Sequence, residues 1–493
     1  MKLTTLIEEL KPLKINGHTN IEITGISHDS RKTQPGDLFV AIRGLNTDGT
    51  LYIEDAHKRG AAAIITEVDG NYGLPTILVE NARQALACAG SWFYYFPERK
   101  LKMVGITGTN GKTTTSYLIK SILEKNSFRT GLVGSIVNMI GDKKLQANYT
   151  TPDSVELMAL LAQMVEDEIQ YAVLEISSHA LALERVSRCI FDKAVFTNLT
   201  HDHLDFHKNI NNYKEAKSIL FNDLLTPDGV RIINYDDEFG QQLLLANNHN
   251  SKTNISYGLN AEAQVRAERI DLRFDGTSFY LTYGDICQHI ELPLIGMFNV
   301  YNTLAAVAYA LSEGIDLEVI VEAIEEFPGV AGRLQMIDCG QDFYVIVDYA
   351  HTPDSLEQVL KTVQALTNGR LITVFGCTGD RDVSKRAKMG ELAAQWSDYF
   401  YITSDDPHSE DPMAIIKDIE RGAIERGSLR RYDYQLEVNR YRAIESALSN
   451  AGAKDVVLIA GKGHETVQVF KDKRIEFSDE KVVREILTHE SRK

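Results

Sequence analysis

The chain has 493 residues, of which 44% are hydrophobic and 25% charged, and its formal net charge is -17. This length exceeds what one hydrophobic core accommodates, so we expect roughly three globular domains. The acidic charge excludes nucleic acid as a partner, because phosphate backbones need a basic protein surface. The sequence contains no apolar run of about 18 residues that would predict a membrane span. Nothing in it indicates an oligomeric state.

Cysteine usage and the N-terminus predict a reducing, cytoplasmic setting. The five cysteines are scattered and form no CxxC pair, which argues against a zinc knuckle and a disulfide framework. The first residues lack the charged and apolar regions of a secretory signal.

Residues 1–98 are predicted to form a first domain in which short β-rich runs alternate with turns. Its predicted elements are strands at 37–42, 61–65 and 76–79, and a helix at 81–96. A polar segment at 97–100 is predicted to be the linker to the next domain.

A second pattern covers residues 99–333. Strands are predicted at 103–107, 171–176 and 193–197, and a helix at 113–126. Strands that alternate with helices predict a parallel sheet covered on both faces. Residues 262–295 favour antiparallel strands added to this domain.

Residues 334–493 form the third predicted domain, which is Rossmann-like. Apolar strands are predicted at 343–348, 371–375 and 456–460, the first ending in a carboxylate. Ligands of such sheets bind at the carboxyl ends of the strands. The predicted fold class is therefore α/β with three domains, the central one built on a phosphate loop.

The phosphate loop is the segment Gly105-Ile106-Thr107-Gly108-Thr109-Asn110-Gly111-Lys112-Thr113-Thr114. Glycines let the backbone wrap a phosphate closely, and the helix N-terminus presents free N–H groups to it. Lys112 can neutralise the β- and γ-phosphates of ATP, and Thr113 can bind magnesium. The strict pattern has glycine where Ile106 stands, so the alternative is a glycine-rich turn with a chance lysine. The flanking strand and helix favour the phosphate loop.

Two strand ends carry candidate metal ligands. Glu175 lies at the end of a predicted strand, and a histidine-rich loop, 198–207, follows the next one. Magnesium prefers oxygen ligands, which favours Glu175, whereas the histidines alone suggest zinc. Solvated loop histidines remain an alternative for His201 and His207. Lys217 lies in a predicted helix, and no pattern distinguishes it from other helical lysines.

Together these pieces resemble the Mur ligases, and among them the UDP-N-acetylmuramoyl-tripeptide synthetases. The resemblance covers essentially the whole chain. It rests on the segments 108–114, 175–179, 198–205, 296–302, 332–333 and 348–354.

The resemblance implies an ATP-dependent ligase of peptidoglycan synthesis. Such an enzyme adds a free amino acid to UDP-N-acetylmuramoyl-L-alanyl-D-glutamate through an acyl phosphate. Carried over by motif, Glu175, His203 and Thr113 bind magnesium, and Lys217 is carbamylated and acts as an oxygen ligand. Lys112, Lys217 and His203 then serve catalysis. The first domain is implied to bind UDP, the second ATP and magnesium, and the third the amino acid.

Further contacts follow from the same resemblance. Nucleotide contacts are implied for Gly108, Thr109, Asn110, Gly111, Lys112, Thr113, Thr114, Asn302, Arg333, Asp348 and His351. UDP contacts are implied for Ser30, Asn46 and Thr47, and muramoyl-dipeptide contacts for Thr150, Thr151, Ser177 and Arg185.

The amino acid added is lysine or meso-diaminopimelate, with lysine slightly favoured. Diaminopimelate-adding relatives carry Asp-Asn-Pro-Arg where this chain has Asp405-Asp406-Pro407-His408. Histidine cannot clamp a distal carboxylate as arginine does, and Asp406 would rather face an ammonium. Against lysine, Gly461 to Glu465 matches the diaminopimelate pattern, and Arg381 is available for a carboxylate.

Two rival functions differ in class. One is another ligase of the same superfamily, such as a folylpolyglutamate synthetase. The other is a non-enzymatic nucleotide switch, which would leave the first and third domains unexplained.

Overall fold

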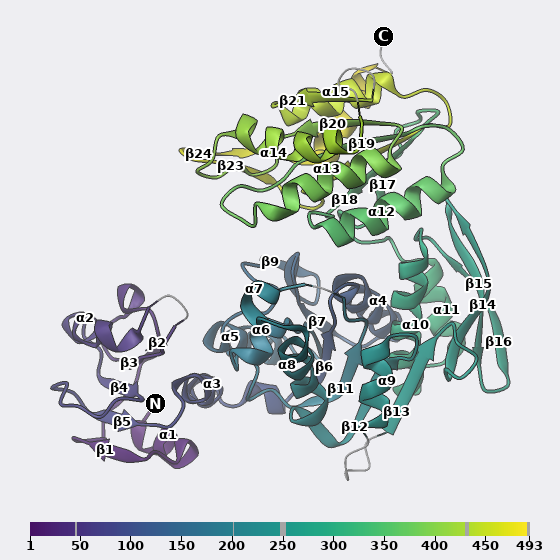
Figure 1. Cartoon of the computed structure of the whole chain (residues 1–493). Helices are drawn as coiled ribbons and strands as arrows, with labels where there is room; N and C mark the ends of the chain where they lie inside the picture. The colour runs from purple at the N-terminus through teal and green to yellow at the C-terminus, as the bar shows by residue number, and fades with distance from the viewer. Residues whose placement is uncertain (45–46, 201, 247–252, 429–432, 491–493) are drawn as a thin grey trace. The chain divides into compact units, whose positions relative to one another are not determined.

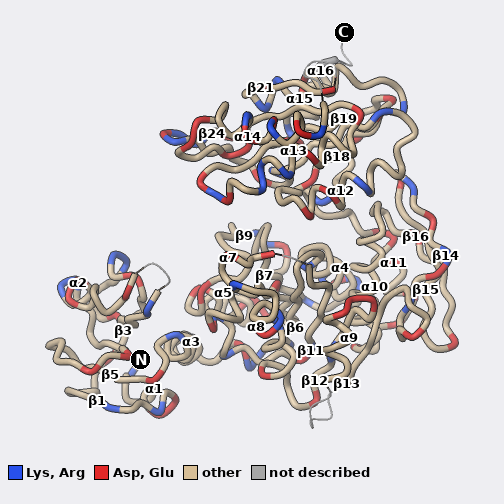
Figure 2. The backbone as a smooth tube through the Cα atoms, in the orientation of Figure 1, with Lys and Arg blue, Asp and Glu red and all other residues tan. Residues whose placement is uncertain are grey.

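The computed structural model describes residues 1–44, 47–200, 202–246, 253–428 and 433–490 (Figure 1). The chain divides into two compact units. The first unit is Met1–Ala267 with Leu281–Cys287 and Tyr301–Ile324, and the second is Glu268–Tyr280 with Gln288–Val300 and Glu325–Lys493. Within the described ranges, every helix is too short or too polar to cross a membrane. Acidic and basic residues are interspersed along both units (Figure 2).

The N-terminal part of the first unit is a five-stranded sheet in the order β1-β5-β4-β3-β2. Its strands are β1 (Lys14–Asn16), β2 (Gly25–Ser27), β3 (Asp37–Val40), β4 (Ala63–Thr66) and β5 (Thr76–Leu78), parallel except for β1. Its helices are α1 (Leu3–Leu10), α2 (Ile53–Lys58) and α3 (Ala82–Phe93), with 3-10 turns at Ser30–Lys32, Gly49–Tyr52 and Pro97–Arg99.

Helix α3 is shorter than the helix predicted at 81–96. Asn81 caps it by accepting hydrogen bonds from the backbone N–H of Arg83 and Gln84, so the helix starts after the cap. Tyr95 and Phe96 have φ values of 60° and 55°, which are left-handed and end the helix at Phe93.

The larger sheet of the first unit runs β13-β12-β11-β6-β10-β7-β8-β9. Its strands are β6 (Lys102–Thr107), β7 (Thr130–Val133), β8 (Val137–Ile140), β9 (Lys143–Gln146), β10 (Tyr171–Glu175), β11 (Phe191–Phe196), β12 (Leu225–Asn234) and β13 (Thr253–Gly258). The inner strands β6, β10 and β11 are parallel neighbours. They are almost entirely buried, as a sheet covered on both faces requires.

Helices α4 (Lys112–Lys125), α5 (Ser154–Glu166), α6 (Ser178–Ala182), α7 (Leu204–His207), α8 (Ile210–Asn222), α9 (Glu238–Leu245), α10 (Met297–Ser312) and α11 (Leu317–Glu325) accompany this sheet in sequence. Strands β14 (Val265–Arg273), β15 (Gly276–Tyr283) and β16 (Ile286–Leu292) continue the sheet order beyond β13. Tight turns join these three strands, so they are antiparallel, as the sequence predicted for 262–295.

The second unit contains a six-stranded sheet in the order β17-β18-β22-β19-β20-β21. Its strands are β17 (Gln335–Met336), β18 (Tyr344–Asp348), β19 (Leu371–Phe375), β20 (Tyr399–Thr403), β21 (Tyr434–Glu437) and β22 (Val456–Ala460). Alternate strand residues face opposite sides. Ile346 packs in one core with α12 (Pro353–Leu366), α13 (Ser384–Trp396) and α14 (Pro412–Glu425). Val345 and Val347 pack in the other with α15 (Arg440–Asn450) and α16 (Asp479–Glu490).

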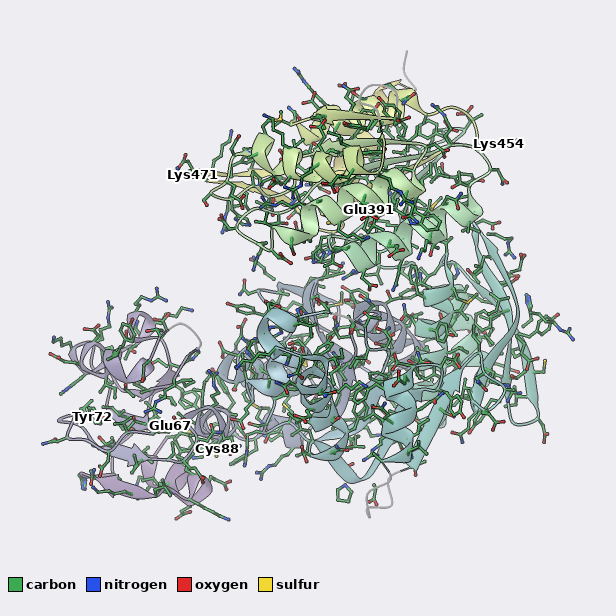
Figure 3. All side chains as sticks on the ribbon, in the orientation of Figure 1. Glu67, Tyr72, Cys88, Glu391, Lys454 and Lys471 are labelled. Atoms are coloured by element: carbon green, nitrogen blue, oxygen red, sulfur yellow. The ribbon has the colours of Figure 1, made fainter. Side chains whose placement is uncertain are left out.

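A separate hairpin, β23 (Val467–Phe470) and β24 (Lys473–Glu476), follows the sheet. Lys471 lies at its turn, at the margin of the unit (Figure 3). The hairpin holds the loop after β20, because the backbone N–H of His408 donates to the carbonyl of Val469 at 3.2 Å. The carboxyl ends of β18, β20 and β22 thus carry polar loops fastened to one another.

Candidate functional site

The glycine loop joins β6 to α4, as predicted. Gly108 and Gly111 have φ values of +156° and +87°. A Cβ on Gly108 would collide with the Thr197 hydroxyl, and one on Gly111 with the side-chain oxygen of Asn302. Glycine is therefore required at both positions, by backbone conformation and by the close neighbours.

Hydrogen bonds to the residues that follow β11 hold this loop in position. The Asn110 N–H donates to the Asn198 side-chain oxygen at 2.9 Å, and the Thr109 N–H donates to the Asn198 carbonyl at 2.8 Å. The Thr197 hydroxyl donates to the Asn110 carbonyl at 2.6 Å. These hydrogen bonds from Thr197 and to Asn198 thus fix the conformation of the loop.

Lys112 and Thr113 open helix α4. The Lys112 ammonium donates to the carbonyls of Gly108 and Thr109 at 2.9 Å each, so it lies over the loop. Thr113 and Thr114 are both buried. A lysine over a glycine loop at a helix N-terminus forms an anion site of the kind that binds phosphate.

Glu175 ends β10 and is completely buried. Its carboxylate accepts hydrogen bonds from the Thr113 hydroxyl at 2.9 Å, from the Ser135 hydroxyl at 3.0 Å and from the Ser135 N–H at 3.2 Å. Oxygen atoms from the ends of three elements meet here, which is the donor set that magnesium prefers. Sequence reasoning missed Ser135, although its position just after β7, next to β10 in the sheet, was a usable signal.

His203 and His207 of the predicted loop pack edge to face against His179. The His179 ring lies 4.8 Å from that of His203 and 5.6 Å from that of His207. His207 is buried and its Nε2 lies 2.9 Å from the Ser178 hydroxyl. In the described part of the chain, His ligand atoms are not gathered as a shared metal site would gather them, and His201 lies outside the described residues.

Lys217 lies on α8, and 1% of its surface is exposed. Its ammonium sits 4.6 Å from the Tyr213 ring centroid. Within the described ranges it forms no hydrogen bond or ion pair. Burial, and then the charge of Lys112, hold the pKa of Lys217 well below the usual range of lysine. The environment therefore favours the neutral amine, which the helical pattern gave no reason to expect.

The residues implied to contact the dipeptide surround the same strand end. The Thr151 hydroxyl donates to the Glu175 carbonyl at 2.8 Å and accepts from the Ser177 N–H at 3.0 Å. Arg185 donates to the Thr151 carbonyl at 3.0 Å. The Thr150 and Ser135 hydroxyl oxygens lie 3.0 Å apart. The structure thus brings these four residues to the Glu175 end of β10.

A cavity of about 790 Å³ adjoins this region. Its lining includes Ser30, Thr47, Arg83 and Arg185. It therefore joins two residues implied to contact UDP with one implied to contact the dipeptide. Asn46, the third predicted UDP contact, lies outside the described residues.

In the second unit, Asp348 organises the backbone around its strand end. Its two carboxylate oxygens accept from the N–H groups of Leu334 and Ala350, each at 2.7 Å. Arg333 lies 4.9 Å from the Tyr349 ring centroid. The Nδ1 atom of His351 lies 2.8 Å from the carbonyl oxygen of Tyr349. Asp348 thus fixes the backbone next to Arg333 and the turn that leads to His351.

The residues predicted to select the amino acid lie on neighbouring loops. Asp380 accepts from the Ser409 hydroxyl at 2.6 Å, so the loop of Arg381 is fastened to that of His408. Both Arg381 and His408 keep solvent-accessible surface. Lys462, which sequence reasoning did not single out, forms ion pairs with Asp406 at 2.9 Å and Glu465 at 2.7 Å. Asp406 therefore has a cationic partner within the chain itself.

His464 makes folding stability depend on pH. Burial, and next the charge of Arg333, hold the pKa of His464 at about 4, and its Nδ1 is buried without a hydrogen bond in the described structure. A histidine with a lowered folded pKa stabilises fully above its unfolded pKa of about 6.5, and this contribution is lost as pH falls towards 4. We expect the melting temperature of the wild type to fall further between about pH 7.5 and about pH 5 than that of His464→Gln. Equal losses in scanning calorimetry would contradict this.

Family models and curated relatives match along most of the chain. Three family models match in chain order: "Mur ligase family, catalytic domain" over residues 22–91, "Mur ligase middle domain" over 106–310, and "Mur ligase, glutamate ligase domain" over 332–463. A curated relative from Clostridium acetobutylicum, named UDP-N-acetylmuramoyl-L-alanyl-D-glutamate--2,6-diaminopimelate ligase 1, is 44% identical and covers 99% of each chain.

Solved structures give the same picture. A structure named UDP-N-acetylmuramoyl-L-alanyl-D-glutamate--2,6-diaminopimelate ligase has a TM-score of 0.71 and 32% identity, covering 98% of this chain and 99% of its own. Folylpolyglutamate synthase of Mycobacterium tuberculosis has a TM-score of 0.63 at 18% identity, covering 76% of this chain and 91% of its own. The second likeness concerns the fold alone, so the folylpolyglutamate alternative is not favoured.

Proposed function

The chain belongs to the Mur ligase family, and from this premise we propose that it joins 2,6-diaminopimelate to UDP-N-acetylmuramoyl-L-alanyl-D-glutamate in peptidoglycan synthesis. The observation that carries the proposal is the 44% identity to a ligase of that name over 99% of both chains. The activity class follows from the family: this is an ATP-dependent ligase that forms an amide bond. A nucleotide switch would not account for the conserved three-domain match. We also propose a cytoplasmic location, where ATP and the UDP-linked substrate would be available.

The chemistry suits the residues of the first unit. A carboxylate is a poor electrophile, so ATP first phosphorylates the substrate carboxylate, and the amine of the incoming amino acid then attacks the acyl phosphate. Negative charge accumulates in both steps. Lys112 and the N-terminus of α4 stabilise that charge. Orientation of the reactants supplies much of the remaining rate.

Magnesium is proposed to bind at Glu175, Thr113, His203 and a carbamylated Lys217. The buried oxygen cluster around Glu175 fits a hard cation. When bound, the ion would supply charge neutralisation on phosphate oxygens. The buried amine of Lys217 forms no ion pair within the described residues, and burial, which outweighs the charge of Asp202, favours its neutral form. A neutral amine is the form that adds CO₂, with loss of a proton, to give a carbamate.

Substrate roles are proposed by domain, with the boundaries 1–98, 99–333 and 334–493. The UDP end is assigned to Ser30, Asn46 and Thr47, and the dipeptide to Thr150, Thr151, Ser177 and Arg185. The cavity that Ser30, Thr47 and Arg185 share supports this assignment. Nucleotide contacts are assigned to Gly108 to Thr114, Asn302, Arg333, Asp348 and His351. The Asp348 carboxylate also accepts a hydrogen bond from the N–H of Leu334, next to Arg333.

Diaminopimelate is the proposed amino acid, and lysine is the second candidate. The relatives' names favour diaminopimelate and give no support to the slight sequence preference for lysine. One feature favours lysine: the family resemblance implies an arginine at the position where this chain has His408. Arg381, on the loop fastened to Ser409, is the cation we propose for the distal carboxylate.

The test is phosphate release by the purified enzyme. Release should require both UDP-N-acetylmuramoyl-L-alanyl-D-glutamate and an amino acid, and a panel should show the highest kcat/KM with diaminopimelate. Release that needs neither substrate would favour a nucleotide switch. Lysine as the best substrate would overturn the assignment of the amino acid.

Arg381→Gln should lower kcat/KM for diaminopimelate about tenfold and leave that for lysine within about twofold, because only diaminopimelate has a distal carboxylate. Arg421→Gln, an exposed arginine on α14, is the matched control and should change neither value. An equal loss with both amino acids would contradict the role given to Arg381.

A further inference from the structure

Lys462 is a fully buried lysine surrounded by carboxylates. It follows β22, and none of its side chain is exposed. Its ammonium lies 2.7 Å from Glu465, 2.9 Å from Asp406 and 3.9 Å from Asp405. The nearby Arg440 is already neutralised by Asp479 at 2.7 Å. Three carboxylates around one ammonium leave surplus negative charge, which suits a ligand with a cationic end.

The three carboxylates differ in their exposure to solvent and in their hydrogen-bond partners. Asp405 and Asp406 have 4% and 14% of their side chains exposed, whereas Glu465 has 34%. One oxygen of Asp406 accepts from both the Lys462 ammonium and the Val469 N–H, each at 2.9 Å. The Glu465 carboxylate accepts from Lys462 alone within the described residues. Glu465 is therefore the carboxylate that is accessible to a ligand. Asp406 is held by its hydrogen bonds to Lys462 and to the backbone of Val469.

We propose that Lys462 and Asp406 form a positioning pair that keeps Glu465 available for the distal ammonium of the incoming diamino acid. Lys462 forms its two shortest ion pairs with these carboxylates, and Asp405 lies farther away at 3.9 Å. Without the charge of Asp406, Lys462 would bind Glu465 more tightly and compete with the substrate ammonium. Asp406 thus acts on substrate selection through Lys462, without contacting the amino acid. The inference rests on the proposed function and adds this residue pair to it.

The test is Asp406→Asn, measured with whichever diamino acid the wild type ligates best. Asparagine keeps an acceptor for the Val469 N–H and removes only the charge. We expect KM for the diamino acid to rise about tenfold or more, since a hydrogen bond to a charged group is weakened. We expect kcat, and KM for ATP and for the UDP-linked dipeptide, to stay within about twofold.

A second substitution in the same protein separates positioning from structure. Adding Lys462→Met to Asp406→Asn removes the competing ammonium, so KM for the diamino acid should return to within about threefold of wild type. Lys462→Gln in the same background serves if the methionine variant does not fold. Lys471→Met, at the exposed hairpin turn (Figure 3), is the control and should leave KM unchanged.

The outcomes are distinct. Asp406→Asn that raises KM for all three substrates together, or a folded double variant whose KM stays high, would overturn the positioning pair while leaving the ligase assignment intact. A wild type that ligates no diamino acid would overturn both.

Discussion

Lys112→Ala should reduce ligation by about 10²–10³-fold or more, the effect expected when one charge-stabilising donor is removed from a preorganised site. Lys112 lies over the glycine loop, bonded to the carbonyls of Gly108 and Thr109. Its charge is needed most when the phosphoryl group is transferred, so the loss should appear in kcat. Phosphate release at saturating substrates measures it.

The matched control lies at the other end of the same helix. Lys125 pairs with Glu322 at 3.2 Å on the surface of α4, and Lys125→Ala should leave turnover near normal. Both variants should keep a wild-type melting temperature within a few degrees, because neither lysine packs in a core. Near-normal turnover in Lys112→Ala would contradict the assignment of this loop as the ATP-binding site.

Much of the fold follows from local sequence. Strands 371–375 and 456–460 were predicted to the residue, because continuous apolar runs bounded by turns predict buried parallel strands. The glycine loop was recognised because its neighbours were a strand and a helix. The end of α3 was not, since two left-handed residues at Tyr95 and Phe96 have no pattern that marks them.

The site was predicted less completely, because its contacts join distant segments. Ser135 reaches Glu175 across 40 residues of sequence, and Lys462 reaches Asp406 across 56. A sequence motif identifies residues within one segment. Contacts between distant segments depend on the order of the strands in the sheet, which a motif does not give. The ion pair between Lys462 and Asp406 was not predicted for this reason, since the two residues lie in different segments.

Lys217 shows the same limit. Its helical position is ordinary, and only burial distinguishes it. A buried lysine normally has an ion-pair partner, because an isolated buried charge is costly. In the described structure Lys217 lies over the Tyr213 ring, and no carboxylate forms an ion pair with it, although the charge of Asp202 acts on it from farther away. A neutral amine removes the cost of a buried charge, and a carbamate would be an anion that the proposed magnesium ion would balance.

Lys217→Ala should therefore lower kcat about 100-fold, the upper range for loss of a group that supports a metal site. Added acetate or bicarbonate should restore part of the activity, because a small carboxylate can take the place of the missing carbamate beside the metal. Lys214→Ala, on the same helix but bonded to Gln242 at 3.4 Å, is the control and should neither lose activity nor respond to acetate. Intact-mass measurement under native conditions should show one CO₂ adduct in the wild type and none in Lys217→Ala. Full activity in Lys217→Arg would contradict the proposal, since arginine keeps a positive charge and forms no carbamate under these conditions.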